Sequence, residues 1–245
     1  MVSWTFVELA EVASTQAVAK DLASKGAPEG TTVVANSQSS GTGRLGRPWT
    51  SPVGGLYMSM ILRPKNLPRP ELVTLVSAVA VVEGVKHSTR LVTSIRWPND
   101  VILRGRKLAG VIAEAESSRQ EVTQVIVGIG VNCNAPVSRL DIATKATSLS
   151  EETRKQIEIP RVRNAILDSF SGLYVRWQHG EEMERVWEGH LSTLGKQVVI
   201  KLKTAETPFS CVATDVDSDG GLLVETEGET VLVRSEDLEW LREEP

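Results

Sequence analysis

A carboxylate and an amine lie close together in the sequence, on either side of a short turn. Asp100 ends the segment Arg96-Trp97-Pro98-Asn99-Asp100, and Lys107 begins the segment Lys107-Leu108-Ala109-Gly110. A hairpin that turns at Arg104-Gly105-Arg106 would bring both side chains toward one end of a sheet. A carboxylate there suits a general base or orienting group, and an ammonium suits developing negative charge. The alternative is a surface ion pair, worth at most about 1 kcal/mol.

A basic loop rich in glycine lies earlier in the chain, in Gly41-Thr42-Gly43-Arg44-Leu45-Gly46-Arg47-Pro48-Trp49. Its glycines let the backbone approach a ligand closely, and the guanidinium groups of Arg44 and Arg47 match the geometry of phosphate. Trp49 offers a flat face to a base or ring. The loop lacks the Gly-Lys-Ser/Thr end of a P-loop, and a strand instead of a helix is expected after it, which argues against a dinucleotide fingerprint. A solvated hairpin loop is the alternative.

Several motifs in this order resemble those of the biotin–protein ligase family. The resemblance rests on Ser14-Thr15, Gln38, Gly41 to Trp49, Gly54-Gly55-Leu56-Tyr57-Met58-Ser59, Trp97 to Asp100, Lys107 to Gly110, and Gly128 to Asn132. It covers essentially the whole chain and implies a ligation in two steps. Biotin and ATP would give biotinyl-5′-AMP and pyrophosphate, and a lysine of a biotin carboxyl carrier protein domain would then take the biotinyl group as an amide.

The resemblance also implies the residues of the site. The catalytic set is Lys107, Asp100 and Arg44. The biotin-binding set is Ser14, Thr15, Gln38, Gly41, Arg44, Lys107, Gly110 and Gly128. The ATP-binding set is Arg44, Arg47, Trp49, Asn99, Lys107 and Asn132, in which Asn132 would hydrogen-bond the adenine. Two simpler interpretations stay open, a helix N-cap for Ser14-Thr15 and close strand packing for the glycines.

The chemistry explains these residue types. Two unit charges 4 Å apart repel by about 1 kcal/mol in water and about 4 kcal/mol at an effective dielectric constant of 20. A lysine between the carboxylate and the α-phosphate offsets that repulsion. Magnesium is expected to arrive with ATP, held largely through the phosphates. The histidines His87, His179 and His190 and the cysteines Cys133 and Cys211 are scattered, so we predict no metal site formed by the protein itself.

Two positions depart from the family pattern. Gln16 stands where the family usually has asparagine, which puts any asparagine-specific contact in doubt, and Thr42 stands where many members have a first arginine. We expect Arg44 and Arg47 to take over the work of that missing cation.

Composition sets the broad class. The chain has 245 residues, of which 41% are hydrophobic and 24% charged, as in ordinary soluble globular proteins. A net charge of −4 argues against generic nucleic-acid binding. We expect a cytoplasmic protein, because the N-terminus resembles no signal peptide and the apolar stretch Leu72 to Val85 is too short to cross a bilayer. Trp4 to Leu9 already resembles the first catalytic strand, so a single-function ligase without a DNA-binding module is expected.

The patterning predicts an α/β (α+β) fold, a mixed sheet with flanking helices followed by a small C-terminal β-barrel. Strands are expected at 31–37, 55–62, 94–97, 101–103, 107–115 and 124–132, and helices at 17–24, 70–87 and 161–190 with a break near Gly180. Short strands at 196–203, 208–216, 221–226 and 230–234 follow. We therefore predict a catalytic domain at 1–192 and a β domain at 193–245.

Three rival functions remain. A lipoate or octanoate transferase has a related architecture, but Gln38 and the arginines of the loop favour biotin over a fatty-acyl chain. A sensor would bind biotin or an adenylate without transferring it. A DNA-binding regulator is disfavoured by the acidic balance. The oligomeric state stays open, with a homodimer through an exposed strand edge as one option that the resemblance implies.

Overall fold

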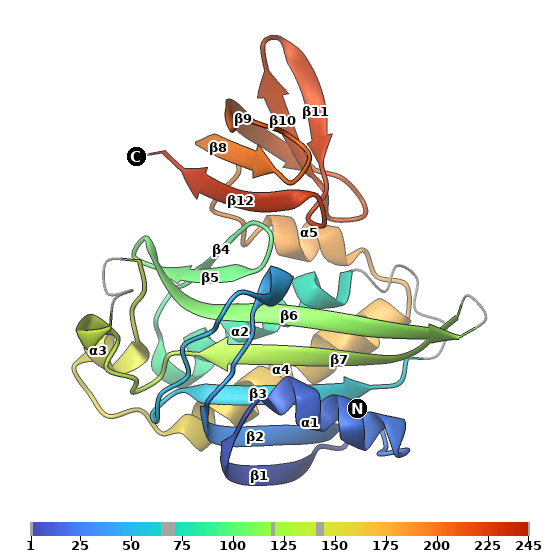
Figure 1. Ribbon diagram of the computed structural model, residues 1–245, viewed down its shortest axis with the longest axis vertical. Helices are drawn as coiled ribbons and strands as arrows, with labels where there is room; N and C mark the ends of the chain where they lie inside the picture. Colours follow the sequence, from blue (N-terminus) through green and yellow to red (C-terminus); the bar gives the residue numbers. More distant parts are fainter. Residues whose placement is uncertain (1, 65–71, 119–120, 141–144, 245) are drawn as a thin grey trace.

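A seven-stranded mixed sheet forms the larger part of the molecule (Figure 1). The computed structural model describes residues 2–64, 72–118, 121–140 and 145–244. The strands are β1 (Thr5–Val12), β2 (Thr31–Gln38), β3 (Leu56–Leu62), β4 (Ser94–Arg96), β5 (Asp100–Leu103), β6 (Arg106–Ser118) and β7 (Glu121–Val131). Their spatial order is β1-β2-β3-β7-β6-β5-β4. Only the β1–β2 pair is parallel, and the other pairs in this sheet are antiparallel.

Helices cover both faces of this sheet. The helix α1 (Thr15–Ser24) packs on β2, β3 and β7, whereas α2 (Val73–Thr89) packs on the other face and is itself covered by α4 (Ile159–Gln178). Every residue of β3 is buried, because the strand is central and both of its faces are covered. The alternation in β3 sends Met58 and Met60 to the main core and Ile61 to the smaller core under α1.

The close packing of α2 and α4 depends on a small residue. A Cβ atom at Gly84 would lie 2.7 Å from the backbone nitrogen of Ile166, so the two helices meet where one has no side chain. The predicted break at Gly180 is confirmed: its φ is +87°, and α4 ends just before it. The short helix α5 (Met183–Glu188) follows. The predicted start of α2 at Pro70 lies outside the described residues.

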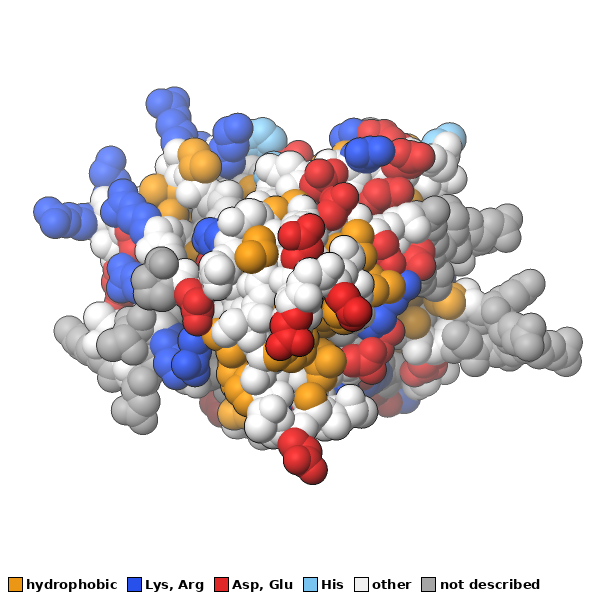
Figure 2. Space-filling model, turned by 90° about the horizontal axis from the view of Figure 1, so that it is seen from above, with side chains coloured by type: hydrophobic (Ala, Val, Ile, Leu, Met, Phe, Trp, Pro, Cys, Tyr) orange, Lys and Arg blue, Asp and Glu red, His pale blue; other side chains and the backbone are white. Residues whose placement is uncertain are grey.

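The C-terminal module is a five-stranded antiparallel sheet (Figure 1). Its strands are β8 (Gln197–Leu202), β9 (Phe209–Val216), β10 (Leu222–Thr226), β11 (Glu229–Val233) and β12 (Leu238–Glu243), in the order β11-β10-β9-β8-β12. Four of these strands match the predicted ones, and the sequence reasoning missed β12. Exposed acidic side chains on this module include Glu206, Glu225, Glu227 and Glu229, and Figure 2 shows acidic groups gathered over this end of the molecule.

Trp97 joins the two sheets. Its indole Nε1 donates to the carbonyl of Gly220 at 3.0 Å, and its backbone N–H donates to Thr193 Oγ1 at 3.0 Å. Buried residues of the C-terminal sheet, such as Ile200 and Leu222, belong to the same apolar cluster as α2. The core therefore runs through both sheets, and the domain division at 192/193 stays a prediction.

From Val111 onward, β6 pairs with β7 alone among the described strands, which leaves an open edge. Among the helices in the described ranges, none combines the length and hydropathy needed to span a bilayer.

Candidate active site

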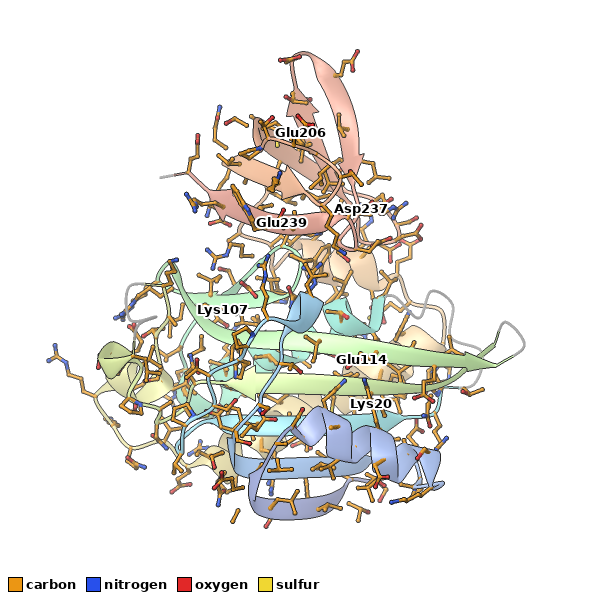
Figure 3. The ribbon with its side chains drawn as sticks, in the orientation of Figure 1. Lys20, Lys107, Glu114, Glu206, Asp237 and Glu239 are labelled. Atoms are coloured by element: carbon orange, nitrogen blue, oxygen red, sulfur yellow. The ribbon has the colours of Figure 1, made fainter. Side chains whose placement is uncertain are left out.

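A cavity of about 270 Å³ lies where the basic loop, the start of α1 and the strands β3, β6 and β7 meet β12. Figure 3 shows Lys107 below the C-terminal sheet, which carries Glu239 above it. Most of the predicted site residues line this cavity: Ser14, Thr15, Gln38, Arg44, Arg47, Trp49, Asn99, Asp100, Lys107, Gly110 and Gly128. The structure thus brings together residues from the N-terminal, central and C-terminal parts of the chain.

The predicted pair across the hairpin forms one contact. Lys107 Nζ lies 2.5 Å from Asp100 Oδ1, and Arg96 contributes a second cation 3.8 Å from Asp100 Oδ2. The two side chains of the closer pair are 30% and 25% exposed, so the pair sits at the cavity wall and not on the open surface. Lys107 Nζ also lies 5.1 Å from the centre of the Trp49 ring, within cation–π range. A plain surface ion pair would not have this enclosure.

Local backbone chemistry aims Lys107. Arg104 and Gly105 both have positive φ, as a tight two-residue hairpin requires, and Leu103 pairs with Arg106. Val101 then pairs with Ala109 but Ile102 pairs with Lys107, so Leu108 is an extra residue in β6. Such a bulge turns a side chain away from the regular alternation. The backbone at Lys107 is therefore set by the turn on one side and by the bulge on the other.

The basic loop closes over the cavity and reaches the C-terminal sheet. Arg44 donates to the backbone carbonyl of Ser235 and, at 3.5 Å, to Asn99 Oδ1. Arg47 donates to the backbone carbonyl of Glu239 at 2.6 Å. Burial lowers the pKa of the Arg44 guanidinium, against the opposite effect of the Asp100 charge. The loop therefore holds a partly desolvated cation over the Asp100–Lys107 pair.

Two paired glycines make room for the indole of Trp49. Gly110 and Gly130 face each other across β6 and β7. A Cβ atom would lie 3.1 Å from the Trp49 ring at Gly110 and 2.7 Å from it at Gly130. The role of Gly128 differs, because its Cβ would lie 2.7 Å from Gln16 Oε1. The glycines are therefore closely packed, as the simpler interpretation predicted. The side chains that pack on them, Trp49 and Gln16, also line the cavity.

A polar network closes the inner end of the cavity. Gln38 Oε1 accepts from the backbone N–H of Thr15 at 2.8 Å, and Thr15 Oγ1 lies 2.9 Å from Ser59 Oγ. Ser59 Oγ donates to Gln16 Oε1 at 3.0 Å, and Gln16 Nε2 donates to Glu114 Oε1 at 3.0 Å. Ser14 occupies the N-cap position of α1, but its side chain makes no capping hydrogen bond. Its hydroxyl is therefore not committed to the helix end.

Two predicted residues lie outside the cavity lining. Gly41 is packed against the loop itself, where a Cβ atom would lie 2.6 Å from Ser51 Oγ. Asn132 is buried and donates through Nδ2 to the carbonyl of Thr147 at 3.0 Å. Sequence reasoning missed Arg96 and Ser59 as members of the site. The available signals were that Arg96 directly precedes the Trp97-Pro98-Asn99-Asp100 motif and that Ser59 ends the Gly54-Gly55-Leu56-Tyr57-Met58-Ser59 segment on which the resemblance rests.

A larger cavity of about 880 Å³ adjoins the first on the other side of the loop and is lined in part by Lys203 and Arg234 of the C-terminal module. Within the described ranges, no group of three or more histidine, cysteine, aspartate or glutamate side chains is placed to hold a metal ion.

Comparison with known proteins agrees with this geometry. Residues 9–132 match the model of the biotin/lipoate A/B protein ligase family. The chain is 36% identical over 234 residues to the bifunctional ligase/repressor BirA of Bacillus spizizenii, covering 93% of this chain and 71% of that protein. It is 30% identical over 229 residues to the biotin–[acetyl-CoA-carboxylase] ligase of Paracoccus denitrificans, covering 88% of this chain and 92% of that protein.

A solved structure shares the whole architecture. The biotin protein ligase from Aquifex aeolicus in complex with biotin and ATP superposes with a TM-score of 0.84 at 30% identity, covering 98% of this chain and 99% of that one. The fold of nearly the whole chain is therefore shared with one solved molecule. The chain belongs to the biotin/lipoate A/B protein ligase family, and within it the chain resembles the biotin protein ligases.

Proposed function

We propose that this protein forms biotinyl-5′-AMP from biotin and ATP and transfers the biotinyl group to a lysine of a biotin carboxyl carrier protein domain. The observation that carries the proposal is the meeting of Lys107, Asp100 and Arg44 at one cavity whose inner end is lined by uncharged polar side chains. The similarity to the Paracoccus denitrificans biotin–[acetyl-CoA-carboxylase] ligase and to the Aquifex aeolicus ligase with biotin and ATP supports the same reaction.

The inner end of the cavity suits the ureido ring of biotin. An uncharged polar ring loses its hydrogen bonds to water on burial and needs replacements. Thr15 and Gln38 supply hydroxyl and amide groups there, and Ser14 adds a hydroxyl. A fatty-acyl chain would have no use for this network, which favours biotin over lipoate or octanoate.

The first step joins two anions. A carboxylate oxygen of biotin attacks the α-phosphorus of ATP, and the bond to the departing pyrophosphate breaks. The Lys107 ammonium offsets the repulsion between the carboxylate and the phosphate, and Arg44 and Arg47 bind phosphate oxygens from the loop. Magnesium travels with ATP and supplies further neutralisation of the phosphates. Asn99 Oδ1 accepts from Arg44 at 3.5 Å, and Asn99 Nδ2 donates to the carbonyl of Val111 at 2.6 Å.

The second step needs a neutral amine. With a reference pKa of about 10.4, only about one lysine in 2,500 is unprotonated at pH 7. Asp100 accepts a proton from the acceptor ammonium, and the neutral amine attacks the acyl carbon. AMP leaves as the carbon–oxygen bond breaks, and the second proton of the amine passes to the departing phosphate or to solvent. The open edge of β6 and the C-terminal sheet flank the cavity, so the carrier domain would approach from that side.

The proposal is tested by ATP–pyrophosphate exchange with labelled pyrophosphate. Exchange that depends on biotin is expected, and it would exclude a sensor that binds without reacting. Calorimetry with biotin and with lipoate separates the two acids, and tighter binding of lipoate would contradict the proposal.

A further inference from the structure

A nearly buried carboxylate joins two segments behind the site. The Glu152 side chain, in α3 (Leu149–Thr153), is only 3% exposed. Its Oε2 accepts from Arg104 at 2.8 Å, and its Oε1 accepts from Arg106 at 2.6 Å and from Thr147 Oγ1 at 2.8 Å. Hydrogen bonds between charged groups are stronger than neutral ones, although the Arg104 and Arg106 side chains are 68% and 41% exposed. Glu152 therefore ties the β5–β6 turn to the segment that precedes α3.

The β5–β6 turn leads directly to a proposed site residue. Arg106 precedes Lys107 in β6, and successive residues of a strand point to opposite faces. Arg106 reaches Glu152 on the outer side, while Lys107 reaches Asp100 at the cavity wall. The contact with Glu152 fixes Arg106, and Lys107 is the next residue of β6, just before the bulge at Leu108. Fixing Arg106 therefore also restrains the backbone at Lys107.

The Thr147 segment is also bound to the Lys107 backbone. The N–H of Lys107 donates to the carbonyl of Lys145 at 2.9 Å, and the N–H of Thr147 donates to the carbonyl of Lys107 at 3.0 Å. The carbonyl of Thr147 accepts from Asn132 Nδ2 at 3.0 Å. One carboxylate thus supports the backbone around Lys107 and the contact that holds Asn132.

We infer that Glu152 is a positioning residue for adenylate formation, acting through Arg106 and Thr147 on Lys107 and Asn132. The inference rests on the proposed function for its catalytic consequence. Among the described residues, the side-chain hydrogen bonds of Thr15 and Gln38 go to each other, to Ser59 and to Ser51. The clamp formed by Glu152, Arg104, Arg106 and Thr147 would therefore reach biotin through Lys107, at the carboxylate end. We expect it to act mainly on the nucleotide end of the site and to leave most biotin contacts in place.

The kinetic test compares Glu152→Ala and Thr147→Val with the conservative variant Thr147→Ser. Glu158→Ala is the matched control, because Glu158 is an exposed carboxylate at the start of α4. In biotin-dependent exchange, Glu152→Ala and Thr147→Val are expected to raise the KM for ATP about tenfold. The biotin Kd measured by calorimetry should stay within about twofold of wild type, and Thr147→Ser should behave as wild type. Unchanged KM and kcat in Glu152→Ala, or equal losses for ATP and biotin, would overturn the inference.

Hydrogen exchange gives a readout that needs no activity. The amides of Lys107 and Thr147 should lose protection in Glu152→Ala and keep it in Glu158→Ala. Unchanged protection of these two amides would refute the clamp. If the wild-type protein showed no ATP–pyrophosphate exchange while the amides of Lys107 and Thr147 still lost protection in Glu152→Ala, the result would instead count against the proposed function.

Discussion

Lys107 Nζ and Asp100 Oδ1 are 2.5 Å apart, so the cation proposed for the first step and the base proposed for the second neutralise each other. When the carboxylate of biotin and the phosphate of ATP attract the Lys107 ammonium, the Asp100 carboxylate loses this partner. Under the proposed function, this contact links the two steps, because Asp100 is free to meet the acceptor lysine only when Lys107 has turned to the adenylate.

Replacing Lys107 by alanine is expected to slow biotin-dependent ATP–pyrophosphate exchange at least about 100-fold, the usual effect of removing one group that stabilises developing charge. Lys86→Ala, which removes an exposed lysine from α2, serves as the control and should retain full exchange. Undiminished exchange by Lys107→Ala would show that another cation performs this task.

Asp100→Asn should separate the two steps. The amide no longer takes a proton from the acceptor lysine, so transfer from purified biotinyl-AMP to a carrier domain is expected to fall about 100-fold. Adenylate formation should fall much less, because the amide still fits beside Lys107. Single-turnover measurements of each step decide the matter. Equal losses in both steps would argue that Asp100 only holds the site together.

Gly130→Ala should displace Trp49, because the new methyl group would lie 2.7 Å from the indole. A displaced indole leaves the loop less able to retain the intermediate, so biotinyl-AMP should dissociate about tenfold faster. Gly172→Ala is the matched control: this exposed glycine of α4 has nothing within 4 Å of its added Cβ. It should leave dissociation unchanged and stabilise the helix by about 0.5–1 kcal/mol. Equal dissociation rates in the two variants would contradict the view that Gly110 and Gly130 make room for the Trp49 indole.

Thr42→Arg adds the cation that many family members carry in the loop. Thr42 is exposed and its backbone is bridged to Pro48, whereas Arg44 and Arg47 already reach toward the site and the C-terminal sheet. We therefore expect release of biotinyl-AMP from the variant to resemble that from wild type. Release is measured by trapping the freed adenylate. A much slower release from the variant would show that Arg44 and Arg47 do not replace a cation at position 42.

The clamp residue Glu152 should also contribute stability that depends on pH. Burial alone would raise the pKa of its carboxyl, but hydrogen bonds from Thr147 and Arg106 and the charge of Arg104 lower the pKa overall. A lowered folded-state pKa contributes stability that is present above the unfolded value and lost as pH falls through the folded value. Urea midpoints of wild type and Glu152→Ala should therefore differ at pH 7 and converge as the pH falls below about 4.3. A constant difference would mean that the carboxylate charge is irrelevant.

Much of the fold follows from local patterns. The alternation of 55–62, the turn at Arg104-Gly105 and the break at Gly180 each predict an element that the structure contains. These signals are local because a strand period, a positive φ and a helix stop each involve only neighbouring residues. The strand β12 was missed because a bulge between Leu238 and Trp240 disrupts its alternation.

The candidate site was predictable as a set of residue types but not as a set of contacts. Arg44 and Arg47 bond to backbone carbonyls of Ser235 and Glu239, and a carbonyl leaves no mark in the sequence. The same holds for Glu152, whose partners lie in a distant turn. Such contacts depend on how the sheet is ordered, and strand order is a long-range property.

The most direct measurement is the mass of a carrier domain after incubation with the purified protein, biotin, ATP and magnesium. The account predicts that the carrier gains one biotinyl group, at a single lysine, only when biotin and ATP are both present. A carrier that keeps its mass under these conditions, or that gains the group with lipoate but not with biotin, would contradict the account.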